Sequence, residues 1–320
     1  MATPKAQMTS LMHLGLGIEA TLGTPVAPTA WVPSQAPKPQ VDITYVADEG
    51  FRGVPWQTFG EYQGTMSSTY QMDGMFYPLS GGNLLAAFLG LDTVTGATPY
   101  LHTFTAADTT PSYTLSDTVL GSAAVGRKFA GSRLSKLKLN FTPKGGLSYT
   151  ANWLGWPDVT YTPEATTFET EPFFLGWEAA LSFGGSPDLN LSKFQLQLER
   201  VGSEALFSAS GTQNPYDIFV GPIKVTWDLS FYMITAGEYD YPYTQTPEVT
   251  QVVVTQPATG AILTLVSSGL QFTKPTIGRG SKYVTVALMG TGYYNATDSG
   301  ALQAMLSNTV TTSYSTTAAS

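Results

Sequence analysis

The strongest constraint on the fold is a strict alternation of apolar and polar residues in two neighbouring segments, 134–141 and 147–153. In the first segment Leu137, Leu139 and Phe141 would share one face, with lysines and an asparagine between them on the other. A period of two is typical of a β-strand that is buried on one face only. The TPKGG that separates the segments is a turn signal, so we predict a β-hairpin over residues 134–154.

The second half of the chain carries a weaker version of the same pattern. The LSK at residues 191–193 matches the LSK at 134–136 with an offset of 57, and it opens a second predicted hairpin over 191–210. A further alternating strand is predicted over 224–233, and a further hairpin over 261–290 with a Gly-Arg-Gly turn at 278–280. Similar alternation occurs in any antiparallel sheet, so an internal repeat is a hypothesis.

Helical patterns are scarce. A short helix is predicted near residues 83–90, with Asn83 as its cap and Gly90 as its end, and another over 299–308. The expected fold class is therefore mainly β: an antiparallel β-sandwich or half-barrel with one or two short flanking helices, with a duplication as an open option. The expected organisation is an extended arm (1–40), a β domain (41–160), a linker (161–176), a second β domain (177–308) and a loose tail (309–320).

Composition limits the function classes. The 320 residues suffice for a large core, and only 12% of them are charged, against roughly 25% in a typical soluble domain. Either much of the surface is buried against copies of the chain, or serine and threonine coat it. The formal net charge of −8 argues against a dedicated nucleic-acid-binding protein. Without any cysteine, disulfides, thiolate nucleophiles and cysteine-bound zinc are excluded.

No apolar run reaches the length of a membrane-spanning helix, and the N-terminal residues lack the pattern of a secretory signal. We therefore expect synthesis in the cytoplasm of the producing cell, without membrane insertion.

Residues 17–34 contain three prolines, Pro25, Pro28 and Pro33. Each proline fixes its own φ and removes a backbone donor, and the residue before it is pushed to an extended conformation. The segment is therefore predicted to be an extended arm without helix.

Residues that could carry catalysis are few. His13 and His102 are the two histidines, and each is expected to be a packed or surface side chain. We find no metalloprotease, nucleophile-elbow or phosphate-loop motif, and the acidic residues lack a spacing that indicates acid–base catalysis. We therefore expect a protein that is not an enzyme and uses no cofactor or metal.

The order of features along the chain is more informative than any single motif. It begins with GIEATLGTPVAPT at 17–29 and continues with DEGFRG, GEYQGTMSSTYQM and PLSGGNLLAAFLG. A YLHTFTAADTTPSYTL segment, taken as a hairpin, and the hairpin that ends in LGWP follow. This order resembles the tail tube (major tail) proteins of long-tailed bacteriophages, most clearly over residues 14–160 and more loosely over 190–295.

The resemblance implies a structural protein of the virion tail, made in the host cytoplasm. Its copies would assemble into rings with a continuous inner β-barrel, and the rings would stack into the tube through which viral DNA is ejected. Expected partners are other copies of the chain, the tape measure protein, the tail terminator and the baseplate or tip proteins. Double-stranded DNA would pass through the tube without sequence recognition.

The resemblance also suggests which residues make contacts. The arm would strap neighbouring subunits together, with contacts from Glu19, Leu22, Pro25, Pro28, Trp31 and Pro33. The polar faces of the two predicted hairpins would line the lumen, through Lys136, Lys138, Asn140, Gln195 and Gln197. A lumen without net positive charge would let DNA slide, because it would not hold the phosphate backbone.

Two questions stay open at this point. If the second half repeats the first, three subunits would close a pseudo-sixfold ring; otherwise six subunits would. The alternative function is that of a β-sandwich carbohydrate-binding, adhesion or virion decoration protein, which would remain a small oligomer. A hydrolase would need a pair of carboxylates in a cleft, and the sequence shows no such pair.

Overall fold

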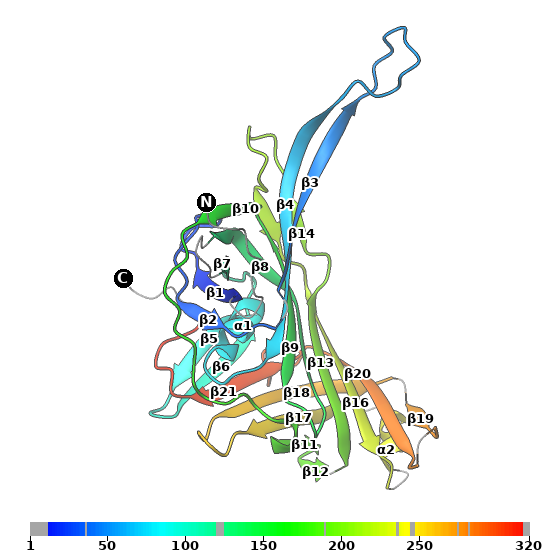
Figure 1. The fold of residues 1–320 in the computed structure, drawn as a ribbon. Coiled ribbons are helices and arrows are strands. Elements are labelled where there is room, and N and C mark those ends of the chain that lie inside the picture. Colours follow the sequence, from blue (N-terminus) through cyan, green and yellow to red (C-terminus); the bar gives the residue numbers. More distant parts are fainter. Residues whose placement is uncertain are drawn as a thin grey trace.

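The computed structural model describes residues 12–35, 37–119, 125–188, 190–234, 237–243, 247–273, 275–280 and 282–315. In this part of the chain antiparallel strands dominate, and one helix exceeds a single turn (Figure 1). The sheet system of the described residues stays open. The predicted mainly β fold class is confirmed.

The first half contains β1 (Met12–Ile18), β2 (Ala30–Val32), β3 (Lys38–Asp48), β4 (Gly60–Met75), α1 (Gly81–Leu89), β5 (Gly90–Thr95), β6 (Tyr100–Ala106), β7 (Tyr113–Val119), β8 (Val125–Phe141), β9 (Ser148–Gly155) and β10 (Asp158–Tyr161). The second half contains β11 (Ala179–Phe183), β12 (Ser186–Asp188), β13 (Leu191–Arg200), β14 (Glu204–Leu206), β15 (Asp217–Phe219), β16 (Ile223–Tyr232), α2 (Gly237–Asp240), β17 (Glu248–Thr255), β18 (Ile262–Phe272), β19 (Thr276–Gly278), β20 (Thr285–Gly292) and β21 (Gln303–Asn308). Single 3₁₀ turns occupy Gly176–Glu178 and Tyr241–Tyr243.

Eight of the described strands form a central sheet in the order β3–β4–β9–β8–β13–β16–β20–β19. The hairpin predicted over 134–154 is confirmed, because β8 pairs with β9 and places Leu139 opposite Tyr149. Burial alternates residue by residue along β9, along β16 and along most of β8 and β13. One face of the central sheet is therefore buried, and the other reaches solvent.

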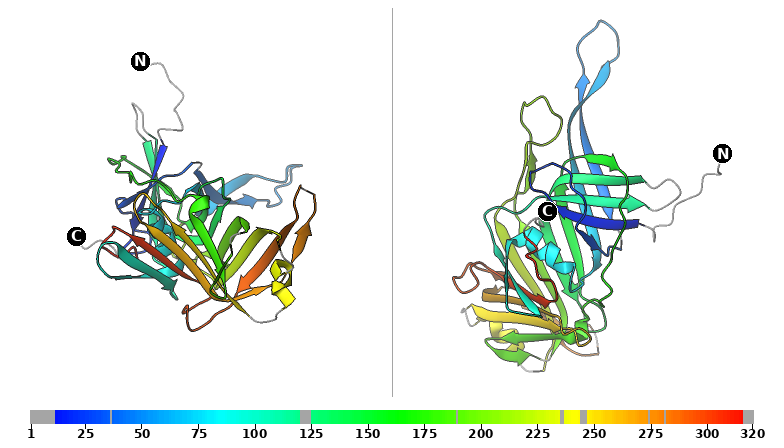
Figure 2. Two further views of the ribbon diagram at one scale, coloured as in Figure 1. Left: turned by 90° about the horizontal axis from the view of Figure 1, so that it is seen from below. Right: turned by 90° about the vertical axis from the view of Figure 1, so that its left-hand side faces the viewer.

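A second layer covers the buried face (Figure 2). It consists of β18 with its neighbours β17 and β21, followed by β6 and β5, while α1 packs against β8 and β6. Between the layers Phe141 stacks on Phe194 at 4.9 Å between ring centroids, and Phe194 meets Trp227 edge-on at 5.6 Å. Burial of each such side chain contributes about 1.5–3 kcal/mol, so this apolar layer dominates the stability of the sandwich.

The helix predicted near 83–90 is present but begins earlier than expected. Ser80, not Asn83, is the residue before its first turn, and Gly90 ends it with φ near +100°. Gly81 and Gly82 lie directly against the rings of Phe76 and Tyr314, where a β-carbon would clash. The two glycines, which lie before the predicted start of the helix, are therefore needed for close packing of its first turn. None of the described helices is long and apolar enough to cross a membrane.

Three predicted elements are wrong. Residues 299–308 do not form a helix, because 303–308 form β21, which pairs with β18 and β6. The partner of β13 in the second predicted hairpin is β16, and residues 201–222 between them carry the small β14–β15 hairpin. β6 and β7 are not a hairpin, since β6 pairs with β5 and β21 while β7 pairs with β1 and β8. In each case pairing with a strand that is distant in the sequence determines the structure, and the helix or local hairpin expected from neighbouring residues does not form.

The segments predicted to be a linker and a loose tail are tied to the body. In the linker, Glu169 accepts hydrogen bonds from the backbone N–H of Leu79 (2.8 Å) and from the Ser80 hydroxyl at the start of α1. In the tail, residues 309–315 pack against the subunit and Tyr314 is buried, so this part of the tail is not loose. Residues 316–320 lie outside the described residues. Because β8 pairs with β13, the two predicted β domains share one sheet, and their boundary stays a prediction.

Arg200 is a buried cation that joins the two halves of the chain. Its guanidinium donates to the carbonyl of Phe88 near the end of α1 (2.9 and 3.2 Å) and to the carbonyl of Ala107 (3.4 Å). Burial lowers the pKa of Arg200 to about 10, so the side chain remains charged near neutral pH. It neutralises the negative end of the helix dipole and satisfies carbonyls that have lost water.

We predict that Arg200→Ala lowers the free energy of unfolding by roughly 2–4 kcal/mol, because it leaves two buried carbonyls without a donor. Arg127→Ala is the matched control: Arg127 is exposed and pairs with Asp158, and such pairs contribute less than about 1 kcal/mol. Urea unfolding of both variants, followed by tryptophan fluorescence, measures the difference. Equal effects of the two substitutions would contradict the structural role of Arg200.

Candidate assembly surfaces

The five predicted lumen residues lie together on the polar face of the central sheet. The register of β8 and β13 places Gln195 opposite Asn140 and Gln197 opposite Lys138, with Lys136 opposite Glu199. All of these side chains are half-exposed. Sequence analysis placed them on two separate hairpins, and the structure joins them into one surface.

This polar face continues across the neighbouring strands. On one side of β8 it includes Thr150 and Asn152 of β9, then Gln71 and Asp73 of β4. On the other side of β13 it includes Thr226 and Asp228 of β16. Its charged residues on these strands are Asp73, Arg133, Lys136, Lys138, Lys193, Glu199, Lys224 and Asp228, and Arg133 forms an ion pair with Asp217 of β15. Positive and negative charges are nearly balanced, so the acidic excess of the chain does not come from this face.

The β3–β4 hairpin extends far beyond the body (Figure 1). Its strands pair from Lys38 opposite Gln71 to Asp48 opposite Gly60, and Arg52 pairs with Asp48 and lies over the Phe59 ring at the tip. Large apolar side chains are exposed along it: Ile43, Tyr45, Val46, Phe51, Val54, Trp56 and Tyr62. An isolated two-stranded hairpin is marginally stable, and so large an exposed apolar surface marks an interaction site. Sequence analysis did not predict this surface. The apolar residues Phe51, Val54 and Trp56, in and directly after the DEGFRG segment, could have indicated it.

The N-terminal arm folds back onto its own subunit. β1 pairs with β7 along its whole length, and β2 returns to pair with β1. Glu19 is buried at the bend, where its carboxylate accepts hydrogen bonds from the Gly23 N–H, the Gly131 N–H and the Thr114 hydroxyl at 2.7–2.9 Å. This side chain is fully used within the subunit. The sequence could not show this, because two of the three partners, Thr114 and Gly131, lie about a hundred residues away.

The other predicted arm contacts differ in exposure. Trp31 is buried against His13, with ring centroids 5.0 Å apart. Leu22, Pro28 and Pro33 are half-exposed, and Pro25 is exposed. The bend therefore presents prolines to its surroundings, while its anchoring side chains point inward. Its role between subunits stays a prediction.

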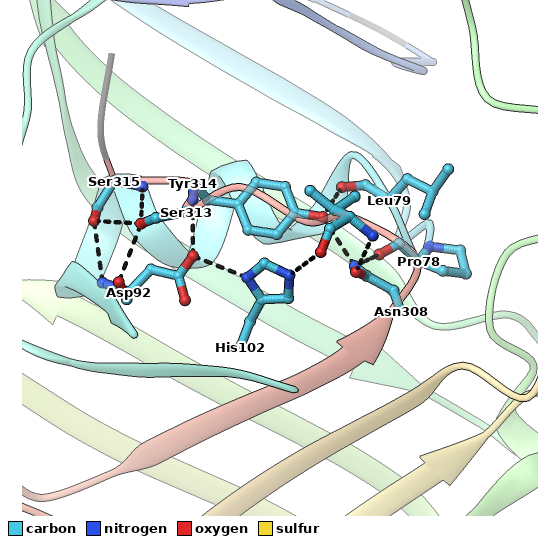
Figure 3. A network of polar contacts seen from close by, with 9 residues as sticks. Pro78, Leu79, Asp92, His102, Asn308, Ser313, Tyr314 and Ser315 are labelled. Carbon is cyan, nitrogen blue, oxygen red and sulfur yellow. Dashed lines mark hydrogen bonds and ion pairs between the residues drawn. The ribbon is translucent and has the colours of Figure 1, made fainter. Parts of the chain in front are cut away.

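The C-terminal segment 309–315 is held by a buried polar network (Figure 3). Asp92 of β5 accepts a hydrogen bond from the Tyr314 N–H (2.7 Å) and contacts Nδ1 of His102 (3.0 Å). Nε2 of His102 lies 2.9 Å from the carbonyl of Val310. The Tyr314 hydroxyl donates to the carbonyl of Leu79 and accepts from Asn308. The segment therefore closes over the junction of β5, β6 and α1.

The network determines the protonation of His102. A carbonyl only accepts, so Nε2 carries a hydrogen, and Asp92 faces the other ring nitrogen. Burial by itself lowers the pKa of His102, but the hydrogen bonds to Asp92 and Val310 and the charge of Asp92 outweigh it, and the pKa is raised above its ordinary value. The raised pKa favours the protonated imidazole beside Asp92, and the contacts of this buried pair fix the C-terminal segment.

A cavity of about 690 Å³ lies between the arm, α1 and the C-terminal segment, with Trp31, Phe168 and Tyr314 in its wall. Its described lining has no catalytic set of side chains. Its carboxylate, Glu169, is used to hold the start of α1. Among the described residues no group of three or more His, Asp or Glu side chains could hold a metal ion.

A comparison with protein families and known proteins gave one finding. The family model described as "Phage tail tube protein" matches residues 9–319. The search of curated proteins gave no match.

We predict that His102 stabilises the subunit in a pH-dependent way. Because its folded-state pKa is raised, its contribution is fully present below the unfolded pKa of about 6.5 and is lost as the pH rises through the folded pKa. His102→Gln should cost on the order of 3 kcal/mol at pH 6, and less at pH 9. Thermal unfolding of dispersed subunits across this range measures the difference, and Asp92→Asn should abolish the same pH dependence. A difference that stays constant with pH would exclude the ion pair.

Proposed function

This chain belongs to the phage tail tube protein family, and we propose that its copies polymerise into stacked rings that form the tube through which DNA is ejected. Family membership makes it a structural protein of the phage tail, located in the virion tail. The ring, the stack and the conduit are our proposal, and the following observations support it.

The main support is the two-sided character of the central sheet. Its inner face is sealed by aromatic and aliphatic side chains, and its outer face carries half-exposed amide, hydroxyl and charged groups on at least five adjacent strands. A wide polar sheet with open edges is suited to line a water-filled channel once copies are joined edge to edge.

The charges of this face suit the passage of DNA. A surface that holds DNA presents an excess of lysine and arginine and releases counterions from the phosphates. Here four lysines and Arg133 are set against three acidic residues on the same strands and Asp217 of β15, with Arg133 3.2 Å from Asp217 and Lys193 3.5 Å from Asp228. Attraction of the duplex to the wall would therefore be weak, and the duplex could slide.

The β3–β4 hairpin would make the contact between rings. It extends past the end of the central sheet along the strand direction (Figure 1), and its apolar tip lacks any cover within the described subunit. The exposed prolines of the arm would add contacts to neighbouring subunits. Contacts with the tape measure protein, the tail terminator and the baseplate or tip proteins belong to the same proposal, through the open ends and the lumen.

Negative-stain microscopy of the purified chain at rising concentration tests the proposal directly. We expect rings and hollow tubes of uniform width. Monomers or small oligomers at every concentration, with or without the other tail proteins, would instead favour a carbohydrate-binding or decoration protein.

We predict that shortening the hairpin separates ring formation from stacking. Replacing residues 49–59 with Asn-Gly keeps a two-residue turn that suits the paired strands and removes Phe51 and Trp56. The variant should form single rings but few tubes, because the contact between rings loses its apolar anchors. Phe51→Ser with Trp56→Ser is a milder variant that keeps the loop length. Tubes of normal length from both variants would rule out this role.

We predict that Gln197 lies inside the tube. The chain has no cysteine, so Gln197→Cys introduces the sole thiol. A maleimide carrying a long polyethylene glycol chain should label this thiol in dispersed subunits and hardly at all in assembled tubes. Ala97→Cys, in the exposed β5–β6 turn on the opposite side of the body, is the control and should be labelled in both states. Equal labelling of Gln197→Cys in both states would place the polar face outside.

A further inference from the structure

The strand pairings of the two halves follow one plan. In the first half β1 pairs with β7, β7 with β8, β8 with β9 and β10, β9 with β4, and β4 with β3. In the second half β11 pairs with β17, β17 with β18, β18 with β20 and β21, β20 with β16, and β16 with β13. Every pair is antiparallel, and the strands follow the same order along the chain in both halves.

Smaller features agree with this correspondence. β1 is followed by β2 as its partner, and β11 by β12. A helix comes after β4 and another after β16. β8 pairs first with β7 and β10 and then with β9, and β18 changes partners in the same order. The β5–β6 hairpin is an addition to the first half, and the β14–β15 hairpin is an addition to the second.

We propose that the chain is a tandem repeat of one unit, and that the junction between its halves is reproduced between copies. Within the chain, β8 of the first unit pairs with β13 of the second. In the first unit the counterpart of β13 is β3. In the second unit β18 and β19 together are the counterpart of β8, and β19 takes the place of its later part. The edge of β19 in one copy therefore pairs with the edge of β3 in the next. This inference rests on the ring assembly proposed above.

The two edges have the chemistry that such a junction needs. Among the described residues, β3 pairs with β4 alone and β19 with β20 alone. Val41 of β3 and Ile277 of β19 are partly buried against the core, and Ile43 is exposed. At the internal junction the corresponding layer is complete, with Phe141 stacked on Phe194. Joining the edges would cover these side chains and pair the free backbone groups, which would otherwise invite aggregation.

The same head-to-tail contact closes into a ring when the rotation per copy permits. Each copy would supply eight strands to an inner barrel: β3, β4, β9, β8, β13, β16, β20 and β19. With strands about 4.8 Å apart and tilted by about 40°, two copies would give a backbone diameter of roughly 32 Å and three copies roughly 48 Å. After side chains, two copies leave too little room for a hydrated B-form duplex of about 20 Å. Three copies are the smallest ring that admits it, with six quasi-equivalent units.

A cysteine pair tests both the contact and the number of copies. Asp42 of β3 and Thr276 of β19 are exposed residues on the polar face, so Asp42→Cys and Thr276→Cys in one chain would lie side by side only across the junction. A short flexible bismaleimide tolerates a small error in register. Treatment of assembled tubes should give a ladder of dimer and trimer on a denaturing gel, which ends at a covalent trimer.

Control variants make the result specific. Each single-cysteine variant should give no species above the dimer, and Ala97→Cys combined with Thr276→Cys should give no ladder. Tubes that form normally but yield no ladder from the Asp42 and Thr276 pair would overturn the junction. A ladder that ends at any number other than three would overturn the three-copy ring. Absence of rings and tubes from the unmodified chain would instead contradict the proposed function, so the two failures are distinguishable.

Discussion

The pairing of β8 with β13 is the interaction on which the rest of the structure depends. It joins the two halves through a register that sets Leu137, Leu139 and Phe141 against the apolar residues of β13. Because side chains alternate across a strand, the same register sets lysine and asparagine against glutamine and glutamate on the other face. A shift by one residue would exchange the two faces. The buried layer and the polar face are thus two results of a single register.

That register is possible because β8 takes part in two sheets, the sheet around β1 and the central sheet. Its first residues pair with β7 and β10, and its later residues pair with β9 and β13. Gly131 lies at the change, with φ near +60°, and the Trp156 ring packs where its side chain would be. Register shifts on either side of this point, between Tyr113 and Leu115 of β7 and between Leu134 and Lys136 of β8, absorb the bend. One long strand can therefore leave the sheet around β1 and enter the central sheet.

Sequence analysis succeeds where partners are local and fails where they are distant. The 134–154 hairpin follows from alternation and a turn signal, and the shared polar face of the five predicted lumen residues follows from the alternation of β8 and β13; their position in a lumen stays a prediction. The partner of β13 could not be deduced, because 201–222 inserts a hairpin before β16. Residues 303–308 contain only three consecutive apolar residues, too few for periodicity to assign a helix or a strand, and the pairing with β6, two hundred residues earlier, decides it. The apparent match of 134–136 with 191–193 brings together two strands that occupy different positions in the proposed repeat.

The low charge of the chain can now be interpreted from particular surfaces. Composition left two explanations: burial against other copies, or a surface coated with serine and threonine. Phe51, Trp56 and Tyr45 on the hairpin and Ile43 at the free edge of β3 are large apolar groups in contact with water, which a serine and threonine coat does not explain. By contrast, the side chains of Glu19, Asp92 and Arg200 make their hydrogen bonds inside the subunit. Charge is thus used to fix the ends of the chain and the junction of its halves, while large apolar groups stay on the surface. In the proposed assembly other copies would cover this surface, and the burial gained there would stabilise the folded subunit by mass action.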